Sequence, residues 1–142
     1  MYSAIATPTA CPVNIDANTA NIVLTEIIIG KIIETKKNIS KILLLTDSRT
    51  RLLAMVQNET NSQGVLRGTY GLTLKMEWIP KNDVVIQGQY VITSGLEEKI
   101  PKGLIVGQIE TVSLKTGALF QEASIRPLVS YNQLQIVAII TS

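Results

Sequence analysis

A chain of 142 residues is long enough to form one ordinary domain and to bury a core without disulfides. Hydrophobic residues make up 46% of it and charged residues 17%, a composition that excludes an intrinsically disordered chain. The net charge is only +2, and the 13 basic and 11 acidic residues are interleaved, which argues against a broad basic face for nucleic acid or for adsorption to a membrane surface.

Residues 1–8 are not expected to form a secretory signal, because they carry no basic residue before their apolar positions and no continuous apolar stretch. Cys11 is the only cysteine, so it cannot form an intrachain disulfide or a thiolate zinc cluster, and no base lies beside it in the sequence. The longest apolar runs, such as 42–45 and 137–140, fall far below the roughly 18 residues that a membrane span requires. These features indicate either a cytoplasmic protein or one whose anchor lies outside this chain.

From residue 21 onward, apolar and polar residues alternate in short segments separated by turn residues, a pattern typical of a β-barrel or β-sandwich. In one segment the alternation predicts that Leu72, Leu74, Met76 and Trp78 face the core. Segments 28–33 and 42–45 are apolar on both faces, which predicts central strands, a covered sheet or an interface. The predicted strands of this all-β fold are 21–24, 28–34, 39–46, 51–57, 64–68, 72–79, 89–94, 104–114, 119–129 and 134–140.

The chain contains no histidine, which removes Ser-His-Asp and Cys-His hydrolases and the histidine-containing zinc hydrolase sites. A carboxylate pair remains conceivable, because Asp47 follows an apolar strand as in aspartic proteases, where a dimer pairs two carboxylates that share a proton. Arg49 occupies the position at which an aspartic protease needs glycine, two residues after the aspartate. Its guanidinium would lower the pKa of Asp47 and keep that carboxyl ionised. We therefore predict a turn-forming Asp47, and no catalytic, cofactor-binding or metal site.

Glycines recur between residues 64 and 71, in a stretch that could be mistaken for a phosphate-binding loop. No predicted helix follows, so there is no helix N-terminus to hold a phosphate. Glycines of turns and bulges are the better interpretation.

Consecutive blocks of the second half resemble the bacterial rod shape-determining MreC family. The matching blocks are 43–48, 64–68, 72–81, 90–96, 100–109, 119–120 and 125–129, in that order. Their motif residues are Gly64, Gly68, Thr93, Ser94, Gly95, Pro101, Lys102, Gly103, Gly107, Arg126 and Pro127. We expect these residues to shape turns and strand edges, because glycine permits a positive φ and proline cannot donate to a sheet ladder.

The resemblance implies small six-stranded β-barrels in a two-barrel architecture, with residues 47–142 as the second barrel. Residues 1–46 would form a first barrel that is incomplete or divergent, because residues 2–20 do not resemble its usual beginning. A tighter and more apolar link at residues 25–30 also replaces the glycine-containing hairpin of the family.

The resemblance also implies a non-catalytic scaffold of the elongation machinery on the outer side of the cytoplasmic membrane. Its expected partners are the elongation transpeptidase, which is a penicillin-binding protein, the membrane protein MreD, the actin-like MreB system and further copies of itself. No cofactor, nucleic acid or small-molecule substrate is expected. Two alternatives remain open: a free-standing β-barrel module that binds a ligand such as a glycan, and a dimeric protease using Asp47.

Overall fold

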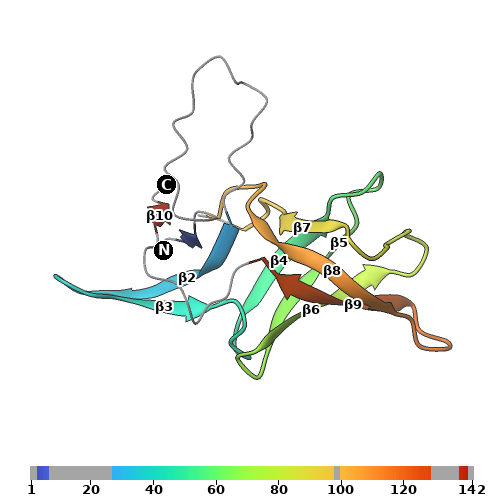
Figure 1. Ribbon diagram of the computed structural model, residues 1–142, viewed down its shortest axis with the longest axis horizontal. Coiled ribbons are helices and arrows are strands. Elements are labelled where there is room, and N and C mark those ends of the chain that lie inside the picture. The colour runs from blue at the N-terminus through green and yellow to red at the C-terminus, as the bar shows by residue number, and fades with distance from the viewer. Residues whose placement is uncertain (1–2, 7–26, 98–99, 129–137, 141–142) are drawn as a thin grey trace, which may run out of the picture.

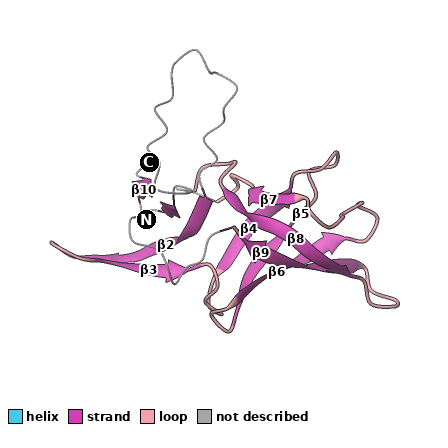
Figure 2. Cartoon of the chain, in the orientation of Figure 1, coloured by secondary structure: helices cyan, strands magenta, loops and turns pink. Residues whose placement is uncertain are grey.

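The computed structural model describes residues 3–6, 27–97, 100–128 and 138–140. This part of the chain consists of β-strands, turns and loops (Figure 2), and none of it forms a helix long and apolar enough to cross a membrane. The strands are β1 (Ser3–Ala6), β2 (Ile27–Thr35), β3 (Ser40–Leu44), β4 (Arg51–Val56), β5 (Gln63–Thr69), β6 (Thr73–Pro80), β7 (Tyr90–Thr93), β8 (Ile105–Ser113), β9 (Phe120–Pro127) and β10 (Ala138–Ile140).

Six of these strands close into a barrel. β4 pairs with β5, β5 with β6, β6 with β9, β9 with β8, β8 with β7, and β7 returns to β4, every pair antiparallel. Closure removes the unpaired edges that a flat sheet would expose. The prediction of an all-β fold with a six-stranded barrel is therefore confirmed. The expected strand 21–24 lies outside the described residues, and β1 was not predicted.

The interior of the barrel is filled by aliphatic side chains that alternate with outward-facing residues along the strands. Each of the valine, leucine, isoleucine and methionine side chains contributes about 1.5–3 kcal/mol when fully buried, so this cluster is the main source of stability. Its members on the barrel strands are Leu52, Ala54, Val56, Leu66, Leu74, Met76, Ile79, Val91, Val106, Ile109, Ala123 and Ile125.

The hairpin of β2 and β3 projects from the barrel (Figure 1). At its base, β2 pairs in parallel with β8 through Ile27 and Ile105, and it also pairs with β1, which pairs with β10. Ile28 belongs to the barrel cluster, whereas Ile27 and Ile29 are buried outside it. Both faces of this part of β2 are thus covered, which is one of the arrangements its apolar sequence predicts. The division of the chain at residues 46 and 47 stays a prediction.

One ion pair connects the hairpin to the barrel. Lys31 on β2 extends its Nζ to Glu97 Oε2 at 2.9 Å and to the carbonyl oxygen of Arg51 at 2.8 Å. The other carboxylate oxygen of Glu97 accepts a hydrogen bond from the backbone N–H of Leu53 at 2.9 Å. Both charged side chains are largely buried. Glu97 therefore holds β2 against the beginning of β4.

The prediction that Leu72 and Trp78 face the core is wrong. Leu72 is the last residue of the turn between β5 and β6, in which Tyr70 and Gly71 both have positive φ, and it is exposed immediately before β6 begins. Trp78 lies in a β-bulge, because the register of β6 against β9 shifts between Met76 and Ile79. The additional residue reverses the alternation, so that Ile79 is buried and Trp78 faces outward.

Candidate docking surface

Asp47, the residue of the protease alternative, lies in the turn that follows β3. Its Oδ1 accepts hydrogen bonds from the backbone N–H of Arg49 at 2.8 Å and from Arg49 Nε at 3.0 Å, and its Oδ2 accepts one from Nη2 at 2.9 Å. The guanidinium hydrogen bond lowers the pKa of Asp47 to about 2, which confirms the predicted effect of Arg49. A proton-sharing carboxylate pair needs the opposite, a carboxyl that keeps its proton.

The ligand-binding alternative requires a concave face on which aromatic and polar groups converge. The interior of the barrel is occupied by aliphatic side chains instead. Among the described residues there is also no group of three or more His, Cys, Asp or Glu side chains that could hold a metal ion. The exposed large apolar side chains of the barrel, in contrast, lie on its outer wall and its loops.

Thr93 connects two of the matching blocks, residues 90–96 and 100–109. Its hydroxyl donates to the carbonyl oxygen of Pro101 at 2.6 Å and accepts from the backbone N–H of Leu104 at 3.0 Å. Its own carbonyl oxygen accepts from the backbone N–H of Gly103 at 3.1 Å. The side chain is fully buried, so each of these bonds is made away from competing water. Thr93 thus fixes where the 94–104 loop returns to the barrel.

Ser94 and Gly95 direct the beginning of the same loop. The Ser94 hydroxyl donates to the carbonyl oxygen of Leu53 at 3.1 Å and accepts from the backbone N–H of Leu96 at 3.3 Å. Gly95 has a φ of +76°, and a Cβ at this position would lie 2.7 Å from the Cβ of Lys102. Only glycine fits this turn without strain. The motif therefore holds the exposed side chain of Leu96 beside Leu53 of β4.

Three further motif glycines allow close crossings of the backbone. A Cβ on Gly68 would overlap the carbonyl oxygens of Asp47 and Leu45, and one on Gly107 would overlap that of Arg126. A Cβ on Gly64 would lie 2.7 Å from the carbonyl oxygen of Glu77, at the bulge that turns Trp78 outward. These glycines are required by packing against backbone atoms, which cannot move aside easily.

The remaining motif residues lie where β9 ends and in the 94–104 loop. Pro127 is the last residue of β9 and is paired with Gly107, while Arg126 is paired with Gln108 and donates to its Oε1 at 3.2 Å. Proline at the last position of β9 is compatible with its missing N–H. Pro101, Lys102 and Gly103 are exposed. The structural roles expected for the whole motif set stay predictions.

Trp78 is the most unusual residue on the outer wall. It has a φ of +63°, a region that bulky residues rarely occupy and that costs a non-glycine residue about 1–2 kcal/mol. Its side chain is 59% exposed and meets the ring of Phe120 on β9 edge to face, with the ring centroids 5.3 Å apart. The only tryptophan and the only phenylalanine of the chain therefore form one exposed aromatic pair.

A shallow groove of about 200 Å³ runs from Trp78 across the neighbouring strands. Apolar side chains dominate its lining. We call this surface the Trp78 groove; it is lined by Leu53, Ala54, Gln63, Gly64, Val65, Trp78, Ser94 and Leu96. Of the motif residues, the structure thus brings Gly64 and Ser94 together in one surface. An apolar groove beside an exposed aromatic pair is suited to binding another protein.

Sequence reasoning missed the central residue of this surface, because strict alternation placed Trp78 inside. One signal was present: Trp78 and Ile79 are adjacent apolar residues, and a strand with period two cannot bury both. That adjacency marks a change of phase, and hence a bulge. Leu53 and Leu96 gave no comparable signal, since each becomes part of the groove only through the fold.

The comparisons with known proteins agree in one family. The family model described as "Rod shape-determining protein MreC, barrel core" matches residues 14–141. The cell shape-determining protein MreC of Listeria monocytogenes is 36% identical over 104 residues, which cover 70% of this chain and 35% of that protein. The chain thus spans about a third of the length of this relative.

Solved structures show the same fold. MreC of Listeria monocytogenes superposes with a TM-score of 0.69 at 29% identity, covering 90% of this chain and 55% of that one. A complex between a penicillin-binding protein, PBP2, and MreC from Helicobacter pylori gives a TM-score of 0.66 at 18% identity over 79% of this chain and 70% of that one. With the family model matched over nearly the whole sequence, this chain belongs to the MreC family.

Proposed function

We propose that this chain is a non-catalytic scaffold of the bacterial elongation machinery, on the outer side of the cytoplasmic membrane, and that it binds the elongation transpeptidase. The match to the MreC barrel core over residues 14–141 carries this proposal. The complex of PBP2 with the Helicobacter pylori relative supports a penicillin-binding protein as the partner. The barrel that this chain shares with that relative is the part expected to make the contact.

We place the docking surface at the Trp78 groove. Tryptophan is over-represented among residues that dominate binding energy, and such residues are usually surrounded by apolar neighbours that exclude water. Trp78 is flanked by Phe120 on one side and by Val65, Leu53 and Leu96 on the other. The strained backbone of Trp78 is compensated by the rest of the barrel, which is typical of positions held for function.

The test measures binding of the purified chain to the extracytoplasmic region of the elongation penicillin-binding protein by isothermal titration calorimetry. We expect Trp78→Ala to weaken binding about 30-fold or more, the effect of losing a dominant interface residue. Tyr70→Ala is the matched control, because Tyr70 is also an aromatic residue with positive φ and is 88% exposed, but lies outside the groove. Binding by this variant should be unchanged.

The possible results of this experiment test the proposed partner and the proposed docking surface separately. Absence of binding by the unaltered chain would contradict the transpeptidase proposal itself. Equal losses for the Trp78 and Tyr70 variants would retain the partner and reject the groove. Thermal unfolding of both variants checks that any loss of affinity does not reflect loss of the barrel.

The proposal also includes self-association and contact with MreD and the MreB system, which the family resemblance implies. Sedimentation equilibrium over a range of concentrations should reveal a dimer or larger assembly. A strictly monomeric chain at high concentration would contradict self-association while leaving transpeptidase binding unaffected.

A further inference from the structure

The outer end of the β2–β3 hairpin is the part of the described chain that lies farthest from the barrel (Figure 1). The hairpin closes in a four-residue turn, residues 36–39, with a hydrogen bond from the backbone N–H of Lys36 to the carbonyl oxygen of Ile39 at 2.7 Å. Thr35 is paired with Ser40 at the end of the two-stranded ladder, and Glu34 with Lys41. We call residues 33–41 the lysine tip.

The lysine tip holds the net charge of the protein. It contains Lys36, Lys37 and Lys41 and a single acid, Glu34, so its formal charge of +2 equals that of the whole chain. The remaining ten basic and ten acidic residues balance. Lys36 Nζ lies 3.5 Å from Glu34 Oε1, but both side chains are more than half exposed, and such a pair is weak and easily exchanged.

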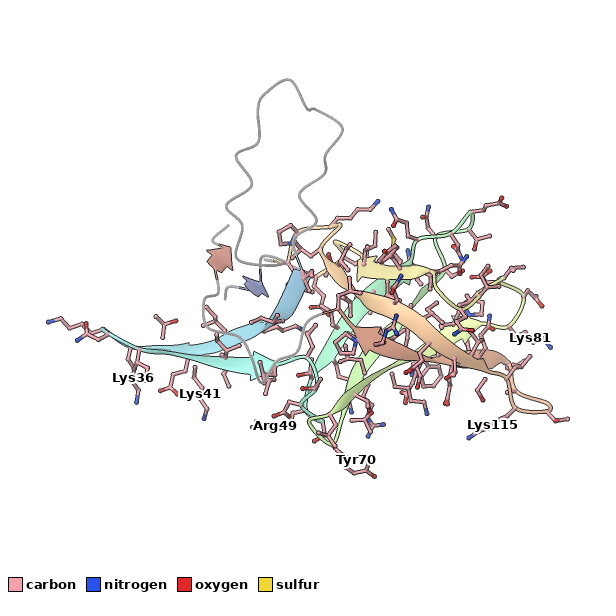
Figure 3. All side chains as sticks on the ribbon, in the orientation of Figure 1. Lys36, Lys41, Arg49, Tyr70, Lys81 and Lys115 are labelled. Carbon is pink, nitrogen blue, oxygen red and sulfur yellow. The ribbon has the colours of Figure 1, made fainter. Side chains whose placement is uncertain are left out.

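The charges point away from the body of the molecule. Figure 3 shows Lys36 and Lys41 extending from the same side of the hairpin, whereas Lys81 and Lys115 lie at the opposite end of the molecule. Although basic and acidic residues are interleaved along the sequence as a whole, the fold presents three lysines together at one extremity. The even distribution inferred from the sequence does not hold for this hairpin.

An apolar side chain lies among these lysines. Ile39 is 69% exposed in the turn, and Ile33, in the bulge of β2, is 43% exposed. Glu34, Lys36, Ile39 and Lys41 together line a surface hollow of about 310 Å³ on the hairpin. An exposed isoleucine surrounded by flexible cationic side chains is the arrangement in which the apolar group enters a lipid layer while the ammonium groups remain at the phosphates.

The shape of the tip favours a lipid surface over a protein. A specific protein interface buries about 800 Å² on each partner, with 20–30 residues on a side. The lysine tip is a protruding two-stranded end of nine residues, which is too small for such an interface. A lipid surface is planar and adaptable, so a small protrusion that combines lysines with an isoleucine can still gain both electrostatic and hydrophobic energy.

We propose that the lysine tip binds an anionic lipid surface, with Lys36, Lys37 and Lys41 beside the lipid phosphates and Ile39 at the boundary of the acyl chains. This surface is separate from the Trp78 groove and uses none of its residues. The contact would orient the barrel relative to a membrane, and it does not depend on the identity of the protein partner.

The test is flotation of the full chain with vesicles at low ionic strength. We expect the protein to float with vesicles of phosphatidylglycerol and phosphatidylcholine, and not with vesicles of phosphatidylcholine alone. The variant Lys36→Gln/Lys37→Gln/Lys41→Gln should partition roughly 100-fold more weakly, because each lysine near an anionic surface contributes about a factor of five.

A second triple variant controls for total charge. Lys81→Gln/Lys102→Gln/Lys115→Gln removes the same number of exposed lysines from the barrel, and it should keep the binding of the unaltered chain. All six lysines are exposed, so neither variant should change the thermal unfolding temperature appreciably. Equal losses in the two variants, or no flotation of the unaltered chain with anionic vesicles, would overturn the proposal.

Two further measurements test the lipid and the insertion. Polyglutamate should compete weakly, and complete displacement by it would assign the tip to an acidic polypeptide instead. In a Trp78→Phe background, Ile39→Trp places the only indole at the tip, and its fluorescence should shift to the blue with anionic vesicles. An unshifted spectrum in the vesicle-bound state would contradict the placement of Ile39 in the acyl boundary.

Discussion

The closed barrel of β4–β9 and the projecting hairpin of β2 and β3 differ in how their strands are covered. Every barrel strand pairs with two neighbours and contributes to one continuous core. In the outer half of the hairpin, the described residues of β2 and β3 pair only with each other, and the side chains of β2 after Ile32 are exposed. The barrel therefore provides a rigid platform, whereas the hairpin presents its side chains to an external surface. The same chain can separate the proposed docking surface on the barrel wall from a charged extremity because only one of the two regions has to hold the fold.

The largest expected effect contrasts a core residue with a tip residue. Leu66 is fully buried at the centre of the barrel cluster, so Leu66→Ala should lower the free energy of unfolding by about 3 kcal/mol through lost burial and a residual cavity. Ile39→Ala should change it by less than about 0.5 kcal/mol, since the side chain is exposed. Urea denaturation measures both. A large loss for Ile39→Ala would show that the hairpin turn is part of the cooperative core.

A smaller effect concerns the loop that shapes the groove. Thr93→Val removes a buried hydroxyl that donates to Pro101 and accepts from Leu104, and leaves both backbone groups without that partner. We expect a loss of about 2 kcal/mol in urea denaturation. Thr93→Ser keeps the hydroxyl and should retain most of the stability. If valine and serine behaved alike, the hydroxyl would not be what fixes the loop.

The connection between the two regions can be tested by a double-mutant cycle. Lys31→Met keeps the aliphatic part of the side chain, and Glu97→Gln keeps an oxygen for the N–H of Leu53. The two changes together should cost about 1 kcal/mol less than the sum of the single changes, because the ion pair is already absent after either one. Strict additivity in urea denaturation would mean that the pair does not hold β2 to the barrel.

The smallest effect is the pH dependence contributed by Asp47. Arg49 lowers its pKa from 3.8 to about 2 in the folded state, so the unfolded chain binds the proton more readily. The resulting stabilisation is complete above the unfolded pKa and is lost as the pH falls through the folded value. The stability difference between the unaltered chain and Asp47→Asn should therefore shrink between pH 3.8 and about pH 2. A difference that is constant over this range would contradict the pairing with Arg49.

Two residues of the candidate site, Gly64 and Ser94, are motif residues that the sequence identified, but in a different role. Gly64 and Ser94 were expected to shape turns and strand edges, and they also line the Trp78 groove. Trp78 was assigned to the core because alternation assumes an unbroken register, and a bulge is a property of two paired strands. Glu97 had no sequence signal at all, because its partners Lys31 and Leu53 are far away in the chain.

The sequence by itself determined that this protein is built of short β-strands, and it located most of them, because alternation between apolar and polar residues is a local property. It also determined the absence of histidine chemistry and the family, which depends on ordered blocks of residues. Only the tertiary structure decided which six strands pair to close the barrel, that Trp78 faces outward, and that the net charge is held at the end of a projecting hairpin. Each of these features depends on which strands pair and in what register. Strand pairing and register are determined jointly by residues that lie far apart in the chain.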